Sequence, residues 1–211
     1  MSKALDAADK CLELDRQNGG AWALSATILA PKQNRLKEAL KAAVHAVALD
    51  AGGVDLVLLK ADLLLAEGSA TAAEESLTKA LEKDMMNGEL RARIATRHLL
   101  DGRPDDAQKL LDETPVGIDH ALLHVVEGRL HLVNADKERD GTGETDATLL
   151  SVAISAFEGA LKLNRELGVA WLGMARTNRL LRNLDAAEEA LTRARSCLLY
   201  TSDAADDGLC V

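Results

Sequence analysis

The feature that most constrains the fold is a spacing of small and bulky residues in the stretch 153–175, AISAFEGALKLNRELGVAWLGMA. Ala153, Phe157 and Ala160 recur at every third or fourth position, which places them on one face of a helix. A short polar joint follows, and a second apolar segment then begins at Trp171. The stretch therefore predicts a helix, a tight turn and a second helix, with small residues that let a neighbouring helix approach closely.

The same spacing recurs along the chain, which is the signature of a repeat architecture. Both tryptophans, Trp22 and Trp171, fall at the same position of the repeat, and Phe157 falls at a bulky position of a second helix. Helix pairs in such arrays contact mainly their neighbours. The predicted units cover residues 19–53, 54–87, 88–120, 121–167 and 168–196, and residues 1–18 match only the second helix of a truncated unit.

This pattern resembles the tetratricopeptide repeat (TPR), in which an aromatic residue opens the first helix and a small residue follows four positions later. The resemblance covers residues 1–196, although Lys60 and Glu127 stand where the family usually has apolar side chains. It implies an all-α fold, a right-handed superhelix of antiparallel helix pairs in a single array. Because neither end carries a polar capping helix, we expect a fragment of a longer array.

An acidic insertion, residues 135–147, separates the two helices of unit 121–167. From Asp136 to Asp140 its acids alternate as in a calcium-binding loop, but Ala147 stands where that loop requires a bidentate glutamate. We therefore expect a solvated loop without calcium.

The last segment, residues 197–211 (CLLYTSDAADDGLCV), resembles a translated sequencing adapter rather than native protein. Without its three aspartates, 31 acidic side chains face 25 basic ones, so the net charge is −6 instead of −9. Cys11 is then the one cysteine left, which fits a reducing compartment.

The charge and hydropathy of the chain make some classes of binding partner less favourable than others. A mildly acidic sequence without a basic block disfavours nucleic acid and anionic membranes. No run approaches the length of a membrane span, and no signal peptide precedes the first amphipathic helix. We expect a cytoplasmic protein that does not insert into membranes.

One stripe of histidines has a potential metal-binding pattern. His120, His124, Glu127 and His131 are spaced four, three and four residues apart on one helical face. A zinc site needs three or four ligands that converge on one point, whereas a straight stripe brings only adjacent members together. We favour a structural role, in which His131, like His98, fills a position where TPRs often have tyrosine, with a metal site as the alternative.

Catalytic motifs are missing from the sequence. It contains no nucleophile motif, no phosphate-binding loop and no Cys/His metal spacing. We therefore predict a protein that is not an enzyme and that binds no cofactor.

The TPR resemblance implies a function in protein–protein interaction, as a scaffold or adaptor whose concave groove receives a partner peptide or helix. The first helices of the repeats line this groove, and its charge runs from acidic in the early repeats to basic in the late ones. Two alternatives remain: a regulatory or anchoring region of a larger enzyme, and a structural spacer in a large assembly. The candidate groove residues are Asp55, Leu58, Asp62, Leu65, Glu89, Thr96, Leu99, Arg129, Arg176 and Arg179.

The groove lacks the residues of chaperone-binding TPRs, which hold a C-terminal carboxylate with lysines and asparagines. None of the candidate groove positions is lysine or asparagine. We therefore do not expect an adaptor of that type.

Overall fold

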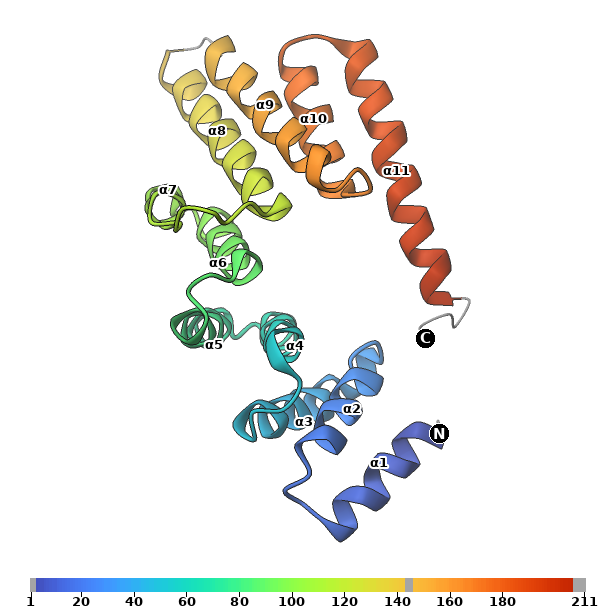
Figure 1. The fold of residues 1–211 in the computed structure, drawn as a ribbon. Coiled ribbons are helices and arrows are strands. Elements are labelled where there is room, and N and C mark those ends of the chain that lie inside the picture. Colours follow the sequence, from blue (N-terminus) through green and yellow to red (C-terminus); the bar gives the residue numbers. More distant parts are fainter. Residues whose placement is uncertain (1–2, 143–145, 207–211) are drawn as a thin grey trace. The chain divides into compact units, whose positions relative to one another are not determined.

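The computed structural model describes residues 3–142 and 146–206, of which the side chains of residues 33, 139–142 and 198–206 are left aside. Every regular element in these ranges is a helix, which confirms the all-α class (Figure 1). The chain divides into two compact units, residues 1–90 and 91–211. Each unit is described separately below.

The first unit contains five α-helices and a short 3₁₀ helix, packed in chain order. Its core consists largely of alanines on α2 and α3, such as Ala26, Ala39 and Ala43, none of which is exposed. Small side chains at these positions let the helices approach closely. The helices are α1 (Lys3–Leu14), α2 (Gly19–Leu29), η1 (Gln33–Arg35), α3 (Leu36–Ala48), α4 (Gly53–Ala66) and α5 (Ala70–Lys83).

The second unit contains α7 to α11 and most of α6. Its cores lie between consecutive helices: one joins α6, α7 and α8, and another joins α8, α9 and α10. α7 is short and ends at Asp112, before Pro115, which cannot continue a helix. The helices are α6 (Gly88–Leu100), α7 (Pro104–Asp112), α8 (Ala121–Thr142), α9 (Ala147–Leu163), α10 (Gly168–Leu180) and α11 (Leu184–Asp206).

One aromatic side chain joins three helices of the second unit. Phe157 on α9 is fully buried, and it lies between Gly128 on α8 and Gly173 on α10. A Cβ atom on Gly128 would lie 2.7 Å from Cε1 and Cζ of the ring, and one on Gly173 would meet the same two atoms. The two glycines therefore provide the space that the ring occupies.

The prediction of a loop over residues 135–147 is wrong for most of that range. α8 continues to Thr142, and α9 begins at Ala147 with the Asp146 side chain accepting a hydrogen bond from the Thr148 backbone N–H (2.7 Å). The reason is a tertiary contact: Ala135 is fully buried in a core that α9 and α10 share. Lys137, Glu138 and Arg139, which follow, also favour helices. The insertion lengthens both helices, and residues 143–145 lie outside the described part.

The last helix extends past the end of the predicted array. α11 runs through Cys197 to Asp206, so the segment that resembles an adapter begins as a continuation of this helix. None of the helices in the described ranges is both long and apolar enough to cross a membrane.

Candidate interaction site

The first helices of two successive repeats lie in contact in the second unit and bring basic side chains together. α8 carries Arg129, and α10 carries Arg176 and Arg179. Arg129 and Arg176 occupy the same position of the repeat, one residue after a buried small residue: Gly128 on α8 and Ala175 on α10. We call Arg129, Arg176 and Arg179 the arginine face.

The members of the arginine face differ in their partners. Arg176 is exposed, and its Nη2 forms an ion pair of 2.6 Å with Oδ2 of Asp136 on α8. Arg129 is half-buried, and it makes no hydrogen bond or ion pair with any described residue. Burial, and then the positive charge of Arg176, lower the pKa of Arg129 from its ordinary value. Guanidinium groups stay charged in proteins, so Arg129 keeps a positive charge that no described side chain pairs with.

The remaining predicted groove residues differ in exposure. Four of the ten are exposed: Asp55, Asp62, Arg176 and Arg179. Five are half-buried: Leu65, Glu89, Thr96, Leu99 and Arg129. Leu58 is only 8% exposed and belongs to the core of α4. The structure brings Arg129, Arg176 and Arg179 together in one unit, and a groove that continues through both units stays a prediction.

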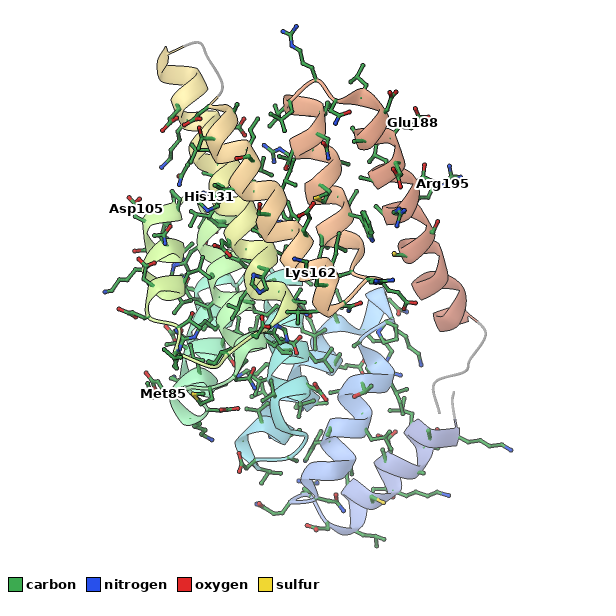
Figure 2. The ribbon with its side chains drawn as sticks, turned by 45° about the horizontal axis from the view of Figure 1, so that its top comes forward. Met85, Asp105, His131, Lys162, Glu188 and Arg195 are labelled. Carbon is green, nitrogen blue, oxygen red and sulfur yellow. The ribbon has the colours of Figure 1, made fainter. Side chains whose placement is uncertain are left out.

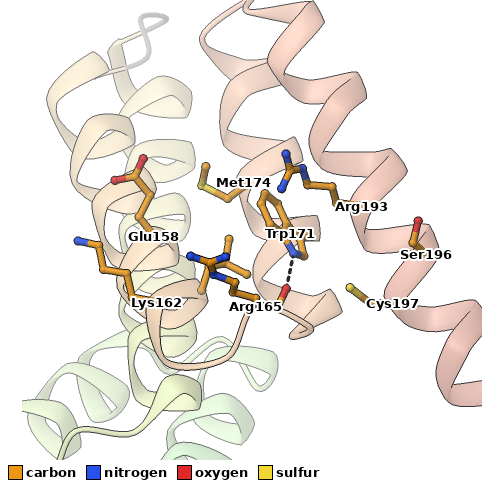
Figure 3. A pocket seen from close by; sticks show the side chains of 9 residues that line it. Glu158, Lys162, Arg165, Trp171, Met174, Arg193, Ser196 and Cys197 are labelled. Atoms are coloured by element: carbon orange, nitrogen blue, oxygen red, sulfur yellow. Dashed lines mark hydrogen bonds between the residues drawn. The ribbon is translucent and has the colours of Figure 1, made fainter.

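A separate hollow of about 510 Å³ lies between α9, α10 and α11 (Figure 3). The indole of Trp171 lines it, with its Nε1–H donating to the backbone oxygen of Arg165 (2.9 Å). The guanidinium of Arg193 lies over the indole ring, 4.9 Å from its centroid, at a distance typical of a cation–π interaction. Cys197, at the start of the adapter-like segment, forms part of the wall, so we build no site on this hollow.

The first unit repeats this arrangement around Trp22. Its Nε1–H donates to the backbone oxygen of Arg16 at 2.9 Å, again six residues earlier. The ring of His45 stacks on it with centroids 4.7 Å apart. Since His45 and Arg193 occupy the same repeat position, both tryptophans sit in one recurring slot that a side chain of the following helix covers.

The histidine stripe lines a hollow of about 450 Å³ between α7 and α8. Figure 2 labels His131, one member of this stripe. His124 Nε2 lies 2.9 Å from Oδ1 of Asp119, and His120 Nδ1 accepts from the backbone N–H of Leu122 (3.3 Å). His131 Nδ1 is buried without a partner. No group of three or more potential ligands converges among the described residues, and the structural role of the histidines stays a prediction. The acidic calcium-like pattern falls mostly on side chains outside the described part.

A comparison of the sequence with protein-family models identifies one part of the chain. Residues 64–116 match the family described as tetratricopeptide repeat. Within residues 64–116, therefore, the chain matches the tetratricopeptide repeat. No match was found among curated proteins.

Solved structures with TPR-like folds resemble the chain along most of its length. The human IFIT1 dimer with PPP-AAAA is 24% identical with a TM-score of 0.66. The match covers 90% of this chain and 45% of the IFIT1 chain. The APC/C hetero-tetramer Cut9-Hcn1 is 18% identical with a TM-score of 0.70, and the match covers 93% of this chain and 36% of that one. YrrB, a TPR protein with an unusual peptide-binding site, is 19% identical with a TM-score of 0.53, and the match covers 92% of this chain and 93% of that one. At these identities the likeness concerns the fold, and the chain spans less than half the length of the IFIT1 chain.

The TPR fold is that of a protein–protein interaction scaffold, and proteins of this kind are generally non-catalytic. The sequence analysis identified the residues of the arginine face but not that Arg129 lacks a partner. It also did not predict that a side chain of the following helix packs over each tryptophan ring. The signal for that cover was present, because His45 and Arg193 stand at equal distances before Ala46 and Ala194.

Proposed function

We propose that the chain binds a protein partner through an extended or helical segment that places an acidic side chain on the arginine face. The single observation that carries this proposal is the charge of Arg129, which is half-buried and has no anionic partner among the described residues. A partner carboxylate beside it would form charge-assisted hydrogen bonds and offset the repulsion from Arg176.

The surroundings of the arginine face support a peptide-like ligand. Leu172, one turn before Arg176 on α10, is 42% exposed and offers an apolar contact beside the positive charges. Arg179 is exposed one turn later on the same helix. An acidic residue flanked by apolar ones matches this order of side chains.

The partner is proposed to be a protein rather than RNA, although one similar structure, that of human IFIT1, contains PPP-AAAA. The chain has a net charge of −9, and its sequence contains no basic block. Nucleic-acid binding instead draws on several phosphate contacts along a basic surface. The experiment therefore includes an RNA arm.

The test is a selection of random peptides, displayed on phage, against the full chain, followed by affinity measurements on the enriched peptides by fluorescence polarisation. Enriched peptides should contain aspartate or glutamate. Arg129→Met should weaken their binding about tenfold or more, equivalent to roughly 1.4 kcal/mol. The matched control is Arg195→Met, which removes one exposed arginine from α11 and should change affinity less than about twofold.

Two results would overturn the proposal. One is a set of enriched peptides without acidic residues, or with equal affinity for the Arg129→Met variant. The other comes from the RNA arm, in which labelled PPP-AAAA is titrated under the same conditions. Tight binding of this RNA that depends on Arg129 would assign the arginine face to nucleic acid instead.

A further inference from the structure

A hollow in the first unit lies beside the residue that stands at the repeat position of the two tryptophans. Val57 on α4 stands at the position of Trp22 and Trp171, and a hollow of about 240 Å³ opens beside it. Its apolar lining comes from α3, α4 and α5, which pack in chain order in Figure 1. The apolar lining residues are Val47, Ala51, Val54, Val57 and Ala80.

The lining matches the surroundings of Trp171 position by position. Val47 corresponds to Leu161, which lines the hollow around Trp171, and Ala51 corresponds to Arg165, whose backbone oxygen accepts the indole N–H. Valine has a much smaller side chain than tryptophan, and the space beside Val57 is open among the described residues.

The residue that covers the ring in the other repeats is also present. Lys79 on α5 stands at the repeat position of His45 and Arg193, and it lines the hollow. In the two tryptophan slots this position supplies a stacked imidazole and a guanidinium over the indole. An ammonium group at this position would interact favourably with the face of an aromatic ring.

Three lysines, Lys60, Lys79 and Lys83, stand in or beside the hollow with two aspartates, which leaves a formal excess of one positive charge. Its two acidic residues already have partners: Asp50 is 3.5 Å from Lys83 Nζ, and Asp84 accepts from the side chain of Asn87 (3.1 Å). Lys79 makes no hydrogen bond or ion pair with a described residue. Lys60 lies one turn after Val57 and also makes none, and burial, followed by the charge of Lys79, lowers the pKa of Lys60.

We propose that this hollow is a second docking site, which receives an aromatic side chain of a partner segment with an acidic residue next to the aromatic one. The ring enters the space beside Val57, Lys79 covers its face, and the neighbouring carboxylate lies near Lys60 and Lys79. The hollow belongs to the first unit, so this site is independent of the arginine face.

The test uses the full chain labelled with ¹⁵N and two five-residue peptides. One peptide has a tryptophan between two aspartates, and the other has alanine in place of the tryptophan. Titration with the tryptophan peptide should shift amide signals of α4 and α5 with a Kd on the order of 1 mM, as for a ligand with one anchoring side chain. The alanine peptide should bind at least about tenfold more weakly.

Three variants locate the binding. Val57→Trp fills the hollow and should abolish the shifts, and Lys79→Gln should weaken binding by roughly threefold or more. The matched control, Lys37→Gln, removes an exposed lysine at the start of α3 and should leave the Kd within about twofold. If Val57→Trp loses its helical circular dichroism, Val57→Leu, which fills the hollow partly, replaces it and should weaken binding.

The proposal is overturned if both peptides shift the same signals with equal affinity, if the shifted amides lie in α8 to α11, or if a folded Val57 variant binds like the unmodified chain. Arg129→Met separates the two proposals, because it should leave these shifts unchanged even where it abolishes peptide binding at the arginine face.

Discussion

The contact of Phe157 with two glycines predicts that Gly173→Ala destabilises the second unit, although alanine is the better helix former. A Cβ atom at this position would meet Cε1 and Cζ of the ring and lie 2.8 Å from Cδ1. The ring has no space to retreat towards α8, because it already packs on Gly128 there, where a Cβ atom would lie only 2.7 Å from Cε1 and Cζ. Relief therefore requires that α9 and α10 move apart.

The magnitude follows from two opposing terms. Replacing glycine by alanine inside a helix stabilises it by about 1 kcal/mol. Overpacking a close-packed core costs about 1–3 kcal/mol, and a ring confined on both sides belongs at the upper end of that range. The net destabilisation should be about 2 kcal/mol, which corresponds to a fall in Tm of roughly 4–8 °C for a chain of this size.

The assay is urea unfolding followed by circular dichroism and tryptophan fluorescence. Gly20→Ala on α2 is the matched control, because a Cβ atom there would make only an ordinary contact of 3.5 Å with Asn18 Oδ1. That variant should be as stable as the unmodified chain or more stable by up to about 1 kcal/mol. In a Phe157→Leu background, Gly173→Ala should no longer destabilise, since the smaller side chain leaves room for the methyl group.

The reasoning is refuted if Gly173→Ala unfolds at the same or a higher urea concentration than the unmodified chain. It is also refuted if the substitution costs as much with leucine at position 157 as with phenylalanine, because the cost would then arise elsewhere.

Three smaller predictions concern single hydrogen bonds. Trp22→Phe removes the donor to the backbone oxygen of Arg16 and should lower the free energy of unfolding by about 1 kcal/mol, measured by urea unfolding; an unchanged value would contradict this. Asn18→Ala removes the N-cap of α2 and should also cost about 1 kcal/mol, whereas Asn18→Ser should restore most of it. Hydrogen bonds from Thr148 hold the pKa of Asp146 below its ordinary value. Folding therefore favours the charged carboxylate, which raises the free energy of unfolding. This contribution is fully present above the pKa of Asp146 in the unfolded state and is lost as the pH falls through its pKa in the folded state. Asp146→Asn should remove this contribution. The difference in the free energy of unfolding between this variant and the unmodified chain should therefore shrink as the pH falls from about 7 to about 3. A difference that stays constant over this range would contradict the prediction.

The fold class followed from the sequence because repeat spacing is a local property. The positions of Phe157, Trp22 and Trp171 reveal helix faces without knowledge of any distant contact. The length of α8 did not follow, because the sequence signal for a loop in the insertion was composition alone. Burial of Ala135 against the neighbouring helices decided that the helix continues.

The candidate site followed from the sequence in part. Counting by repeat position identified Arg129 and Arg176, and the structure places them on helices that are in contact. It did not identify Leu58 as a core residue, because the exposure of a helical residue depends on which neighbours cover that side of its helix.

The sequence by itself determined the all-α class, the order of helix pairs and the equivalence of positions between repeats, because these depend on periodicity within short segments. Only the tertiary structure decided which equivalent positions are filled, paired or empty. Phe157 is confined by glycines on two other helices, Arg129 has no carboxylate partner among the described residues, and the space beside Val57 is open. The physical reason is that packing and ion pairing depend on side chains from different helices, whose distances the spacing along the chain does not specify.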